Sequence, residues 1–420
     1  MRLLIYGLNF SPELTGIGKY TGEFCEWLLQ QEADDLKVIT GYPYYPEWRI
    51  HPEHPGTLYS TQVEKGMTIY RCPLWVPQRP TAIRRILHLL TFAFTSLPVL
   101  LWQALWWRPD VIWVVAPALF CAPAAWVAAK LARAKSWLHF QDLELDAAFN
   151  LGILSLPGLK PLVFGFERLL LRYFDRISTI SQALMHRLLE KGLDPQRAEL
   201  FPNWVDTDQI YPLREANPLR AEWELDPNQT IILYSGNMGE KQGLEVVIEA
   251  ARHLQSDPQL LFVLVGEGSA RARIEAEAAD LSNVRFFPLQ PLESLNWVLN
   301  LGDIHLLPQR AEADKAVMPS KLTGILACGG AVIATATPQS EVGSIVKEIG
   351  GLLTAPGEGK ALAAAIQTLA DNPQRRRLIQ EQARAYAVDH LGKHQVLQGF
   401  YEKLLMLTTE EMVDCETVRI

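Results

Sequence analysis

The stretch "MPSKLTGILACGG", residues 318–330, combines residue types that bind an anion. We expect Ser320 to cap a short apolar helix, whose first turn carries Lys321 and the backbone N–H groups up to Leu322. Free N–H groups, the positive end of a helix dipole and a cation together favour a phosphate or diphosphate. A Gly-Gly pair then ends the helix. The sequence therefore predicts an anion site here that contains no acidic residue.

Three further glycine-containing turns follow apolar runs, where bare backbone N–H groups can approach an anion. "FSPELTGIGKYTGEF" is either such a site or only a turn, because its glycine spacing misses the dinucleotide fingerprint by one residue. "YSGNMGEKQGLE" adds amide and ammonium donors, and "LFVLVGEGSA" leaves backbone against which a flat ring could lie. The candidate residues in these turns are Gly16, Gly236, Asn237, Lys241, Gln242, Gly266 and Gly268.

The elements that must position these turns are strands alternating with amphipathic helices. Runs rich in Val, Ile and Leu recur near residues 3–8, 36–40, 68–71, 111–115, 136–140, 176–180 and 198–201, and again near 230–234, 260–265, 284–288, 304–307, 331–335 and 351–354. Runs of this kind predict parallel sheets covered by helices on both faces. Two sets predict an α/β protein with two doubly wound domains.

The two sets are separated by "FPNWVDTDQIYPLREANP", which is rich in Pro, Asn and Asp. We expect one Rossmann-like domain over residues 1–203 and a second over residues 204–385. Ligands of open α/β sheets bind beyond the carboxyl ends of the strands. The expected site is therefore the cleft between two facing domains.

Composition restricts the partners of the chain. The net charge of −8 argues against nucleic-acid binding. Five scattered cysteines with no CxxC pair indicate a reduced, cytosolic chain without structural zinc. The N-terminal "MRLLIYGLNFSPE" is interrupted too early by Asn and Pro to be a signal peptide.

The region from residue 65 to residue 141 is different, because it holds nine Lys and Arg, one acid and seven of the twelve tryptophans. Residues 86–107 form a run without any Lys, Arg, Asp or Glu. This run is long enough for a membrane span, although Pro98 and several polar residues interrupt it. We favour a helix lying in the lipid headgroup region, with the arginines of residues 79–108 facing anionic lipid. A buried core helix and a true span remain as alternatives.

Several motifs of the chain occur in the order typical of one enzyme family. "FSPELTGIGKYTGEFCEWL", "ISTISQALMHRLLEKG", "ELFPNWVDTD", "SGNMGEKQGLEVVIEAA", "FVLVGEGSARARIE" and "MPSKLTGILACGGAVIATA" resemble family 4 glycosyltransferases of the GT-B fold. "GYPYYPEW" and "PSKLTGILACGG" are similar to the branch of colanic acid biosynthesis glycosyltransferases. The resemblance covers residues 1–405. It implies two Rossmann-like domains and a C-terminal helix, residues 386–410, that returns to the first domain.

The resemblance implies retaining transfer from a nucleoside diphosphate sugar, UDP- or GDP-linked, with no metal and no cofactor. The diphosphate would bind the second domain, where the family commonly has an Arg and a Lys in the turn after the first strand. Here those positions hold Asn237 and either Lys241 or Gln242, so one cation is missing, and Lys321 is expected to compensate.

The family's two second-domain glutamates, eight positions apart, are replaced by Ala316 and Gly324. Nearby carboxylates that could approach the sugar instead are Glu312, Asp314 and Glu341. The loss of the pair leaves two readings open, altered donor selection or an inactive enzyme.

In the first domain, "LHFQDLELDAAF" follows a strand, and the resemblance places Gln141-Asp142 where relatives often have His-Asp. Asp142 would orient sugar hydroxyls or, alternatively, cap a helix; His139 is expected to be structural, and Glu144 and Asp146 are weaker candidates. Tyr44, Tyr45 and Trp48 of "GYPYYPEW" would line the acceptor entrance or pack on the core. Polysaccharide repeat units are commonly built on a polyprenyl diphosphate, which predicts a lipid-linked saccharide acceptor. The enzyme would then be cytoplasmic and peripheral to the inner face of the cytoplasmic membrane.

Two other interpretations use the same fold. A sugar-nucleotide epimerase would need the donor site but no acceptor and no membrane surface. An inactive GT-B subunit that scaffolds a polysaccharide assembly complex would explain the lost glutamates.

Overall fold

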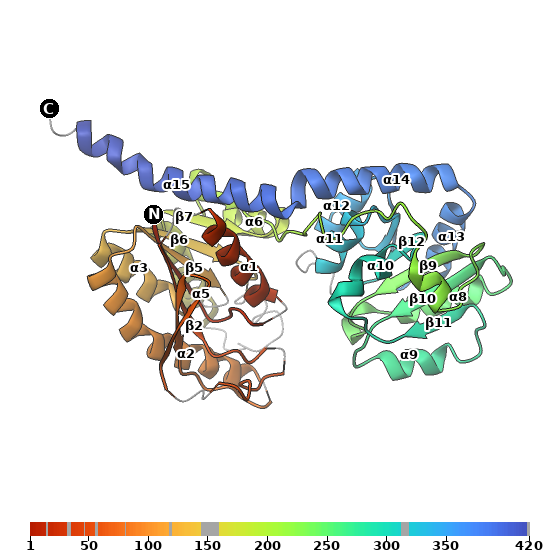
Figure 1. The fold of residues 1–420 in the computed structure, drawn as a ribbon, viewed down its shortest axis with the longest axis horizontal. Coiled ribbons are helices and arrows are strands. Elements are labelled where there is room, and N and C mark those ends of the chain that lie inside the picture. The colour runs from red at the N-terminus through yellow and green to blue at the C-terminus, as the bar shows by residue number, and fades with distance from the viewer. Residues whose placement is uncertain are drawn as a thin grey trace. The chain divides into compact units, whose positions relative to one another are not determined.

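The computed structural model describes residues 1–13, 16–31, 35–45, 47–54, 58–79, 81–116, 120–143, 159–311 and 319–417, apart from the side chains of residues 82, 159–163 and 410–417. The chain divides into two compact units. The first comprises Met1–Pro202 together with Leu397–Ile420, and the second comprises Asn203–Val396. Each unit is an α/β domain built on its own sheet (Figure 1). Glu144, Asp146, Glu312, Asp314 and Ala316 lie outside the described residues.

The first unit contains an eight-stranded sheet with the order β3-β4-β2-β1-β5-β6-β7-β8. Its central strands are buried along almost their full length, as expected for apolar runs covered on both faces. All pairs are parallel except β3 with β4. The strands are β1 (Arg2–Gly7), β2 (Asp35–Gly41), β3 (Ser60–Glu64), β4 (Met67–Cys72), β5 (Val111–Ala116), β6 (Lys135–Phe140), β7 (Arg176–Thr179) and β8 (Ala198–Leu200).

The helices of the first unit connect these strands. They are α1 (Gly16–Gln30), α2 (Ala82–Trp102), which a π-helical turn (Gln103–Trp107) continues, α3 (Ala122–Ala132), α5 (Leu159–Tyr173) and α6 (Gln182–Glu190). A βα succession of this kind requires each strand to run in the same direction, which places the ends of β1 and β6 at one edge of the sheet.

The second unit contains a six-stranded sheet, all parallel, in the order β11-β10-β9-β12-β13-β14. Its strands are β9 (Thr230–Ser235), β10 (Leu260–Val265), β11 (Val284–Phe287), β12 (Ile304–Leu307), β13 (Val332–Thr335) and β14 (Leu352–Thr354). Its helices of five or more residues are α7 (Pro218–Glu222), α8 (Glu245–His253), α9 (Arg271–Glu277), α10 (Leu295–Leu299), α11 (Ser320–Ala327), α12 (Glu341–Glu348), α13 (Gly359–Ala370), α14 (Pro373–Tyr386) and a π-helical turn (Ala387–Leu391).

Helix α2 packs only one side against the first sheet. Phe92, Ser96 and Leu100 are buried, and the Ser96 hydroxyl lies 2.6 Å from the hydroxyl of Tyr6 in β1. The opposite side is apolar and exposed. The buried-core alternative for residues 86–107 is therefore wrong, because only 28% of the apolar window in this helix is buried in the described structure. The segment Ile83–Trp107 is the one described helix long and apolar enough to cross a membrane by length and composition alone.

The last helix, α15 (Lys393–Thr417), joins the first unit from Leu397 onward. The ring of Phe400 stacks on Phe201 with centroids 3.7 Å apart and packs edge-on against Trp137 and Phe24. Lys403 reaches Glu199 in β8. Apolar aromatic packing therefore fixes this helix on the first unit, where it is seen as the blue helix beside α1 (Figure 1).

Candidate functional site

The glycine turns after β9 and β10 are packed against one another in the second unit. Gly266 has a φ of +151°, and a Cβ there would clash with the carbonyl oxygen of Gly236. A Cβ at Gly268 would lie 2.5 Å from the backbone of Met238. Three backbone hydrogen bonds join the turns, from Gly236 N–H to Val265, from Met238 N–H to Glu267 and from Ala270 N–H to Met238. These glycines are therefore required by the close approach of two turns, a reason the sequence does not reveal.

The ammonium group of Lys321 lies at the carboxyl end of β9. Its Nζ donates to the Tyr234 hydroxyl at 2.5 Å and to the Asn237 carbonyl oxygen at 3.1 Å. Its Cε fills the space beside Gly236, where a Cβ would be 2.6 Å away. These neighbours are neutral, and desolvation by burial lowers the pKa of Lys321 to about 7. The structure thus brings together Lys321, Gly236 and Asn237, which the sequence predicts as one site.

Helix α11 begins one residue earlier than a serine cap requires. Pro319 takes the N-cap position without a side-chain capping bond, so the expected N-cap role of Ser320 is wrong and Ser320 is the first helical residue. The Gly-Gly stop is confirmed, because Gly329 has a φ of +68° and Gly330 N–H donates to Ile325 at 2.7 Å. A Cβ at Gly324 would lie 3.2 Å from Leu299, so the position of the missing glutamate abuts an apolar side chain.

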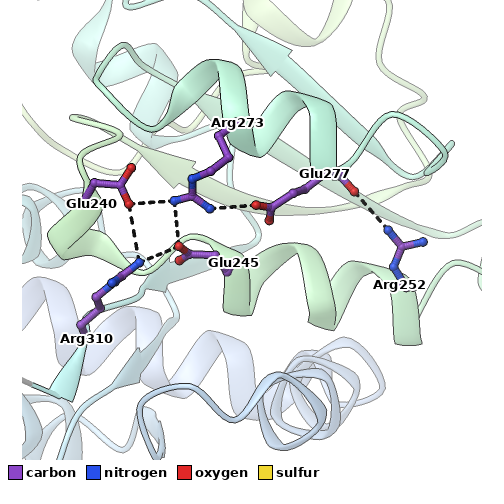
Figure 2. Close-up of polar contacts among 6 residues, drawn as sticks. All are labelled: Glu240, Glu245, Arg252, Arg273, Glu277 and Arg310. Carbon is purple, nitrogen blue, oxygen red and sulfur yellow. Dashed lines mark hydrogen bonds and ion pairs between the residues drawn. The ribbon is translucent and has the colours of Figure 1, made fainter.

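An ion-pair network holds the turn between β9 and α8 (Figure 2). Arg273 of α9 pairs with Glu240, Glu245 and Glu277 at 2.8 Å each. Arg310, which follows β12, pairs with Glu245 at 2.6 Å and Glu240 at 3.6 Å. Its backbone N–H also donates to the Lys241 carbonyl.

The network decides which cations remain for a ligand of the second unit. Both guanidinium groups are neutralised by carboxylates. In the described part of this turn's surroundings, Lys241 and Lys321 are the cations without a carboxylate within 4 Å. A diphosphate bound at this turn would therefore meet these two lysines first.

The remaining donor candidates are placed separately. Gln242 belongs to a short 3-10 turn, Glu240–Gln242, after Gly239. Glu341 is the first residue of α12, behind the Ser340 cap. Burial, and then the charges of Glu348 and Glu341, raise the pKa of Tyr386 to about 12. Asp314 is outside the described residues.

A cavity of about 340 Å³ opens at the carboxyl ends of β1, β2 and β6 in the first unit. It brings together the expected acceptor residues Tyr44, Tyr45 and Trp48 with Gly16 and Asp142. Gly16 begins α1 with a φ of +59° and open space where a side chain would be. The other lining residues are Leu8, Asn9, Glu13, Ile17, Arg85, His88 and Leu89. Sequence motifs far apart in the chain therefore form one pocket.

Glu13 organises this pocket, and sequence reasoning missed it. Its Oε1 accepts the N–H groups of Tyr44 and Tyr45 at 3.1 Å each, and its Oε2 accepts from Asn9 at 2.9 Å. Arg71 of β4 secures the same two loops by donating to the Ser11 and Gly41 carbonyls. Burial raises the pKa of the Glu13 carboxyl. The available signal was an acid inside an otherwise apolar, Pro-containing loop.

The histidines of the first unit differ in role. His139 in β6 is fully buried, lies 2.9 Å from Ser178 and has its pKa lowered to about 3 by burial, so its structural role is confirmed. His88 of α2 lines the cavity, with its Nδ1 2.6 Å from the Trp75 carbonyl. Its ring packs against Tyr44, with centroids 4.6 Å apart, and against Trp48 at 5.5 Å.

Asp142 follows β6 and lines the cavity. Its Oδ1 accepts the N–H of Leu143 at 2.8 Å. Among the residues that the structure covers, no group of three or more side chains suited to a metal ion comes together.

Two family profiles match the chain, "Glycosyl transferase 4-like domain" over residues 15–204 and "Glycosyl transferases group 1" over residues 216–386. The chain is a glycosyltransferase of this family. It is 42% identical over 409 residues to the putative colanic acid biosynthesis glycosyl transferase WcaI of Escherichia coli K12, covering 95% of this chain and 98% of that protein. The family resemblance in the sequence is thereby confirmed.

Solved structures share the fold of this glycosyltransferase. Sucrose-phosphate synthase from Thermosynechococcus elongatus superposes with a TM-score of 0.70 at 16% identity, covering 97% of this chain and 99% of that one. HepE of Anabaena, solved in complex with UDP-glucose, superposes with a TM-score of 0.64 at 16% identity over 97% and 100% of the two chains. At this identity the likeness shows the fold, which is GT-B, with two parallel-sheet Rossmann-like domains.

Proposed function

We propose that this glycosyltransferase moves a sugar from a nucleoside diphosphate sugar to a lipid-linked saccharide acceptor, with retention at the anomeric carbon, in cell-surface polysaccharide synthesis. The observation that carries the donor half is Lys321, held at the end of β9 beside the turns of Gly236 and Gly266. The relative WcaI is named for colanic acid biosynthesis, and HepE was solved with UDP-glucose. Both support a sugar nucleotide as the donor here.

In this proposal the second unit stabilises the leaving diphosphate. Lys321 exchanges its neutral partners Tyr234 and Asn237 for phosphate oxygens, and the first turn of α11 adds N–H groups that no side chain caps. Such fixed donors lower the barrier, because charge develops on the leaving group in the transition state. A leaving phosphate that itself accepts the proton of the acceptor hydroxyl needs no strong protein base. This suits a site whose glutamate positions are Ala316 and Gly324.

The acceptor half rests on the cavity of the first unit. Tyr44 and Trp48 contribute aromatic rings to its lining, and Asp142 contributes a carboxylate that can orient sugar hydroxyls. Aromatic rings beside a hydrogen-bonding acid suit a hydroxylated ring, because its apolar faces stack while its hydroxyls donate. Each unit must hold its substrate so that the acceptor oxygen meets the anomeric carbon in line for reaction.

The acceptor is proposed to be a polyprenyl-diphosphate-linked saccharide, reached from the inner face of the cytoplasmic membrane. Helix α2 supports this because its outer side exposes Ile83, Phe94 and Trp106, while arginines lie at both of its ends. Apolar side chains next to cations suit the headgroup region of an anionic leaflet. Binding to liposomes with and without anionic lipid at low salt measures this directly, and equal indifference to both would remove the membrane from the proposal.

Thermal melting with UDP, GDP, ADP and dTDP, without added metal, tests the donor half. A nucleotide that binds only the folded state adds about 2.7 kcal/mol of stability at a hundredfold excess over its dissociation constant. We expect one nucleotide to raise the melting temperature, and Lys321→Ala to abolish most of that rise. Indifference to all four nucleotides would favour an inactive scaffold subunit, for which the apolar surroundings of Gly324 are the specific argument.

A further inference from the structure

Helix α2 begins with an arrangement that is unfavourable unless an anion is bound. Arg84 and Arg85 lie in its first turn, which has no acidic residue, and the Thr81 side chain makes no capping bond. Cations at the positive end of a helix dipole repel the dipole rather than complement it. One phosphate-containing ligand could accept from the uncapped N–H groups and from the guanidinium of Arg85, whereas Arg84 already donates to the Arg79 carbonyl oxygen at 3.4 Å.

Arg85 is the arginine of this turn whose side chain lies at the cavity of the first unit. It lines that cavity, and its guanidinium lies 5.2 Å from the ring centroid of Trp48. Among the described residues it has no carboxylate within 4 Å, and the carboxylate of Glu13 is already engaged by three N–H donors. Arg84 does not line the cavity, although it is the adjacent residue and is also exposed. Arg84 is therefore a matched control for Arg85, with the same charge but outside the cavity.

His88 provides an independent sign that the cavity has a ligand. The side chain is 1% exposed, and its Nε2 has no hydrogen-bond partner among the described residues. Because Nδ1 faces the Trp75 carbonyl at 2.6 Å, Nδ1 carries the proton and Nε2 is an acceptor. Burial lowers the pKa of His88, which keeps this neutral form. An unpaired buried acceptor costs free energy that a ligand hydroxyl would restore.

The same helix bears the exposed apolar surface. Ile83 and Leu87 flank Arg84 and Arg85 in sequence, and the apolar side continues to Phe94, Trp102 and Trp106, the last two being stacked at 4.2 Å. A polyprenyl diphosphate that carries a sugar has three matching groups, an anion for Arg85, hydroxyls for His88 and a hydrocarbon chain for the apolar side. Helix α2 offers a partner for each of them.

We propose that the first turn of α2 and Arg85 bind the diphosphate of a polyprenyl-linked acceptor, that His88 Nε2 accepts a hydroxyl of its first sugar, and that the chain lies along the apolar side of α2. This assignment rests on the proposed function, and it names a recognition residue for the acceptor. It gives the arginines of the first unit a role separate from that of Lys321 in the second.

The test measures binding of farnesyl diphosphate to the full chain in a Lys321→Ala background, which removes the donor-site lysine as an alternative phosphate ligand. We expect Arg85→Gln to weaken this binding by at least about tenfold, the loss of one charge-assisted contact. Arg84→Gln makes the same charge change outside the cavity and is expected to stay within about twofold. Equal losses for both variants, or none for Arg85→Gln, would overturn the assignment.

Further ligands distinguish the sources of the phosphate and the role of the histidine. Farnesyl diphosphate should bind more tightly than inorganic diphosphate, because only the former has a chain for the apolar side; equal affinity would point to free phosphate and overturn the lipid part. His88→Phe should leave farnesyl diphosphate binding unchanged but weaken a saccharide-diphospho-polyprenol in neutral phosphatidylcholine vesicles; an equal effect on both ligands would remove His88 Nε2 from sugar recognition.

The nucleotide melting shift, measured on the unsubstituted protein with UDP, GDP, ADP and dTDP, separates this inference from the proposed function. A shift with one nucleotide but no farnesyl diphosphate binding overturns the acceptor assignment alone. No shift with any of the four, together with Arg85-dependent farnesyl diphosphate binding, supports the assignment and overturns the donor proposal.

Discussion

The two units each largely bury a charged side chain, but the charges are of opposite sign and have different partners. In the second unit a cation, Lys321, is held by neutral oxygens, and the nearby guanidinium groups form ion pairs with glutamates. In the first unit an anion, Glu13, is held by backbone N–H groups, while Arg85 has no described carboxylate partner. A charge that is fully satisfied by the protein holds the fold together, whereas a charge with weak protein partners is a candidate for binding a ligand.

The largest effect is expected from Gly266→Ala, which would disrupt the close contact between the two glycine turns of the second unit. The substitution meets both a φ of +151° and the Gly236 carbonyl. We expect the free energy of unfolding of this unit to fall by roughly 3 kcal/mol, measured by denaturant unfolding. Gly357→Ala is the matched control, with a φ of +82° but no neighbour within 4 Å, and should cost about 1 kcal/mol. Equal costs would show that the turn contact is unimportant.

Glu13→Ala tests whether the first unit depends on its satisfied carboxylate. Two backbone N–H groups and the Asn9 amide would lose their acceptor, at a cost of about 2–3 kcal/mol in unfolding free energy. Amide hydrogen exchange at Tyr44 and Tyr45 should accelerate as well. Glu26→Ala, which removes an acid of α1 from its surface ion pair with Lys65 at 2.7 Å, should change stability by less than about 1 kcal/mol. Unchanged exchange rates at the two tyrosines would show that Glu13 does not hold their N–H groups.

Lys321→Ala tests the weakly partnered charge of the second unit. Nucleotide binding should weaken by roughly 1.5–3 kcal/mol, the value of a hydrogen bond to a charged group, in a calorimetric titration. Lys241→Ala removes an exposed lysine from the same turn and measures whether this second cation shares the role. Donor affinity that survives both changes would place the diphosphate elsewhere.

The lowered pKa of Lys321 makes donor affinity depend on pH. Burial lowers the pKa of Lys321 in the free protein to about 7. The ammonium form therefore predominates below pH 7 and is lost as pH rises through that value. Because a bound diphosphate favours the charged form, binding takes up a proton above pH 7. Affinity should then fall by up to about tenfold per pH unit. Lys321→Ala should flatten this dependence; an unchanged profile in the variant would assign it to another group.

Glu240→Gln is expected to have the smallest effect. Glu240 is exposed and belongs to the surface network of Figure 2, where Arg273 keeps Glu245 and Glu277 as partners. Stability should change by about 0.2–1 kcal/mol in low salt and by less in high salt. A cost above 2 kcal/mol would mean that the network fixes the turn more firmly than its exposure indicates.

Prediction from sequence was strongest where a single element carries the signal. Buried strands such as β10 and β12 begin and end where the apolar runs do. β3 was missed because its residues are mostly exposed on an edge and do not form an apolar run. His88 reads in sequence as one polar residue that interrupts an apolar helix, and nothing local reveals that Trp75 fixes its tautomer.

The alternation of apolar strands with helices, the glycine turns at strand ends and the cation in the first turn of α11 can be predicted from the sequence, because they depend on neighbouring residues. The contact of Lys321 with Asn237, 84 residues away, and the hydrogen bond from Tyr44 to Glu13, 31 residues away, arise only from the folded arrangement of the strands. Which strand ends become neighbours follows from sheet order. A polar group acquires its role only when that order surrounds it with partners or leaves it without them.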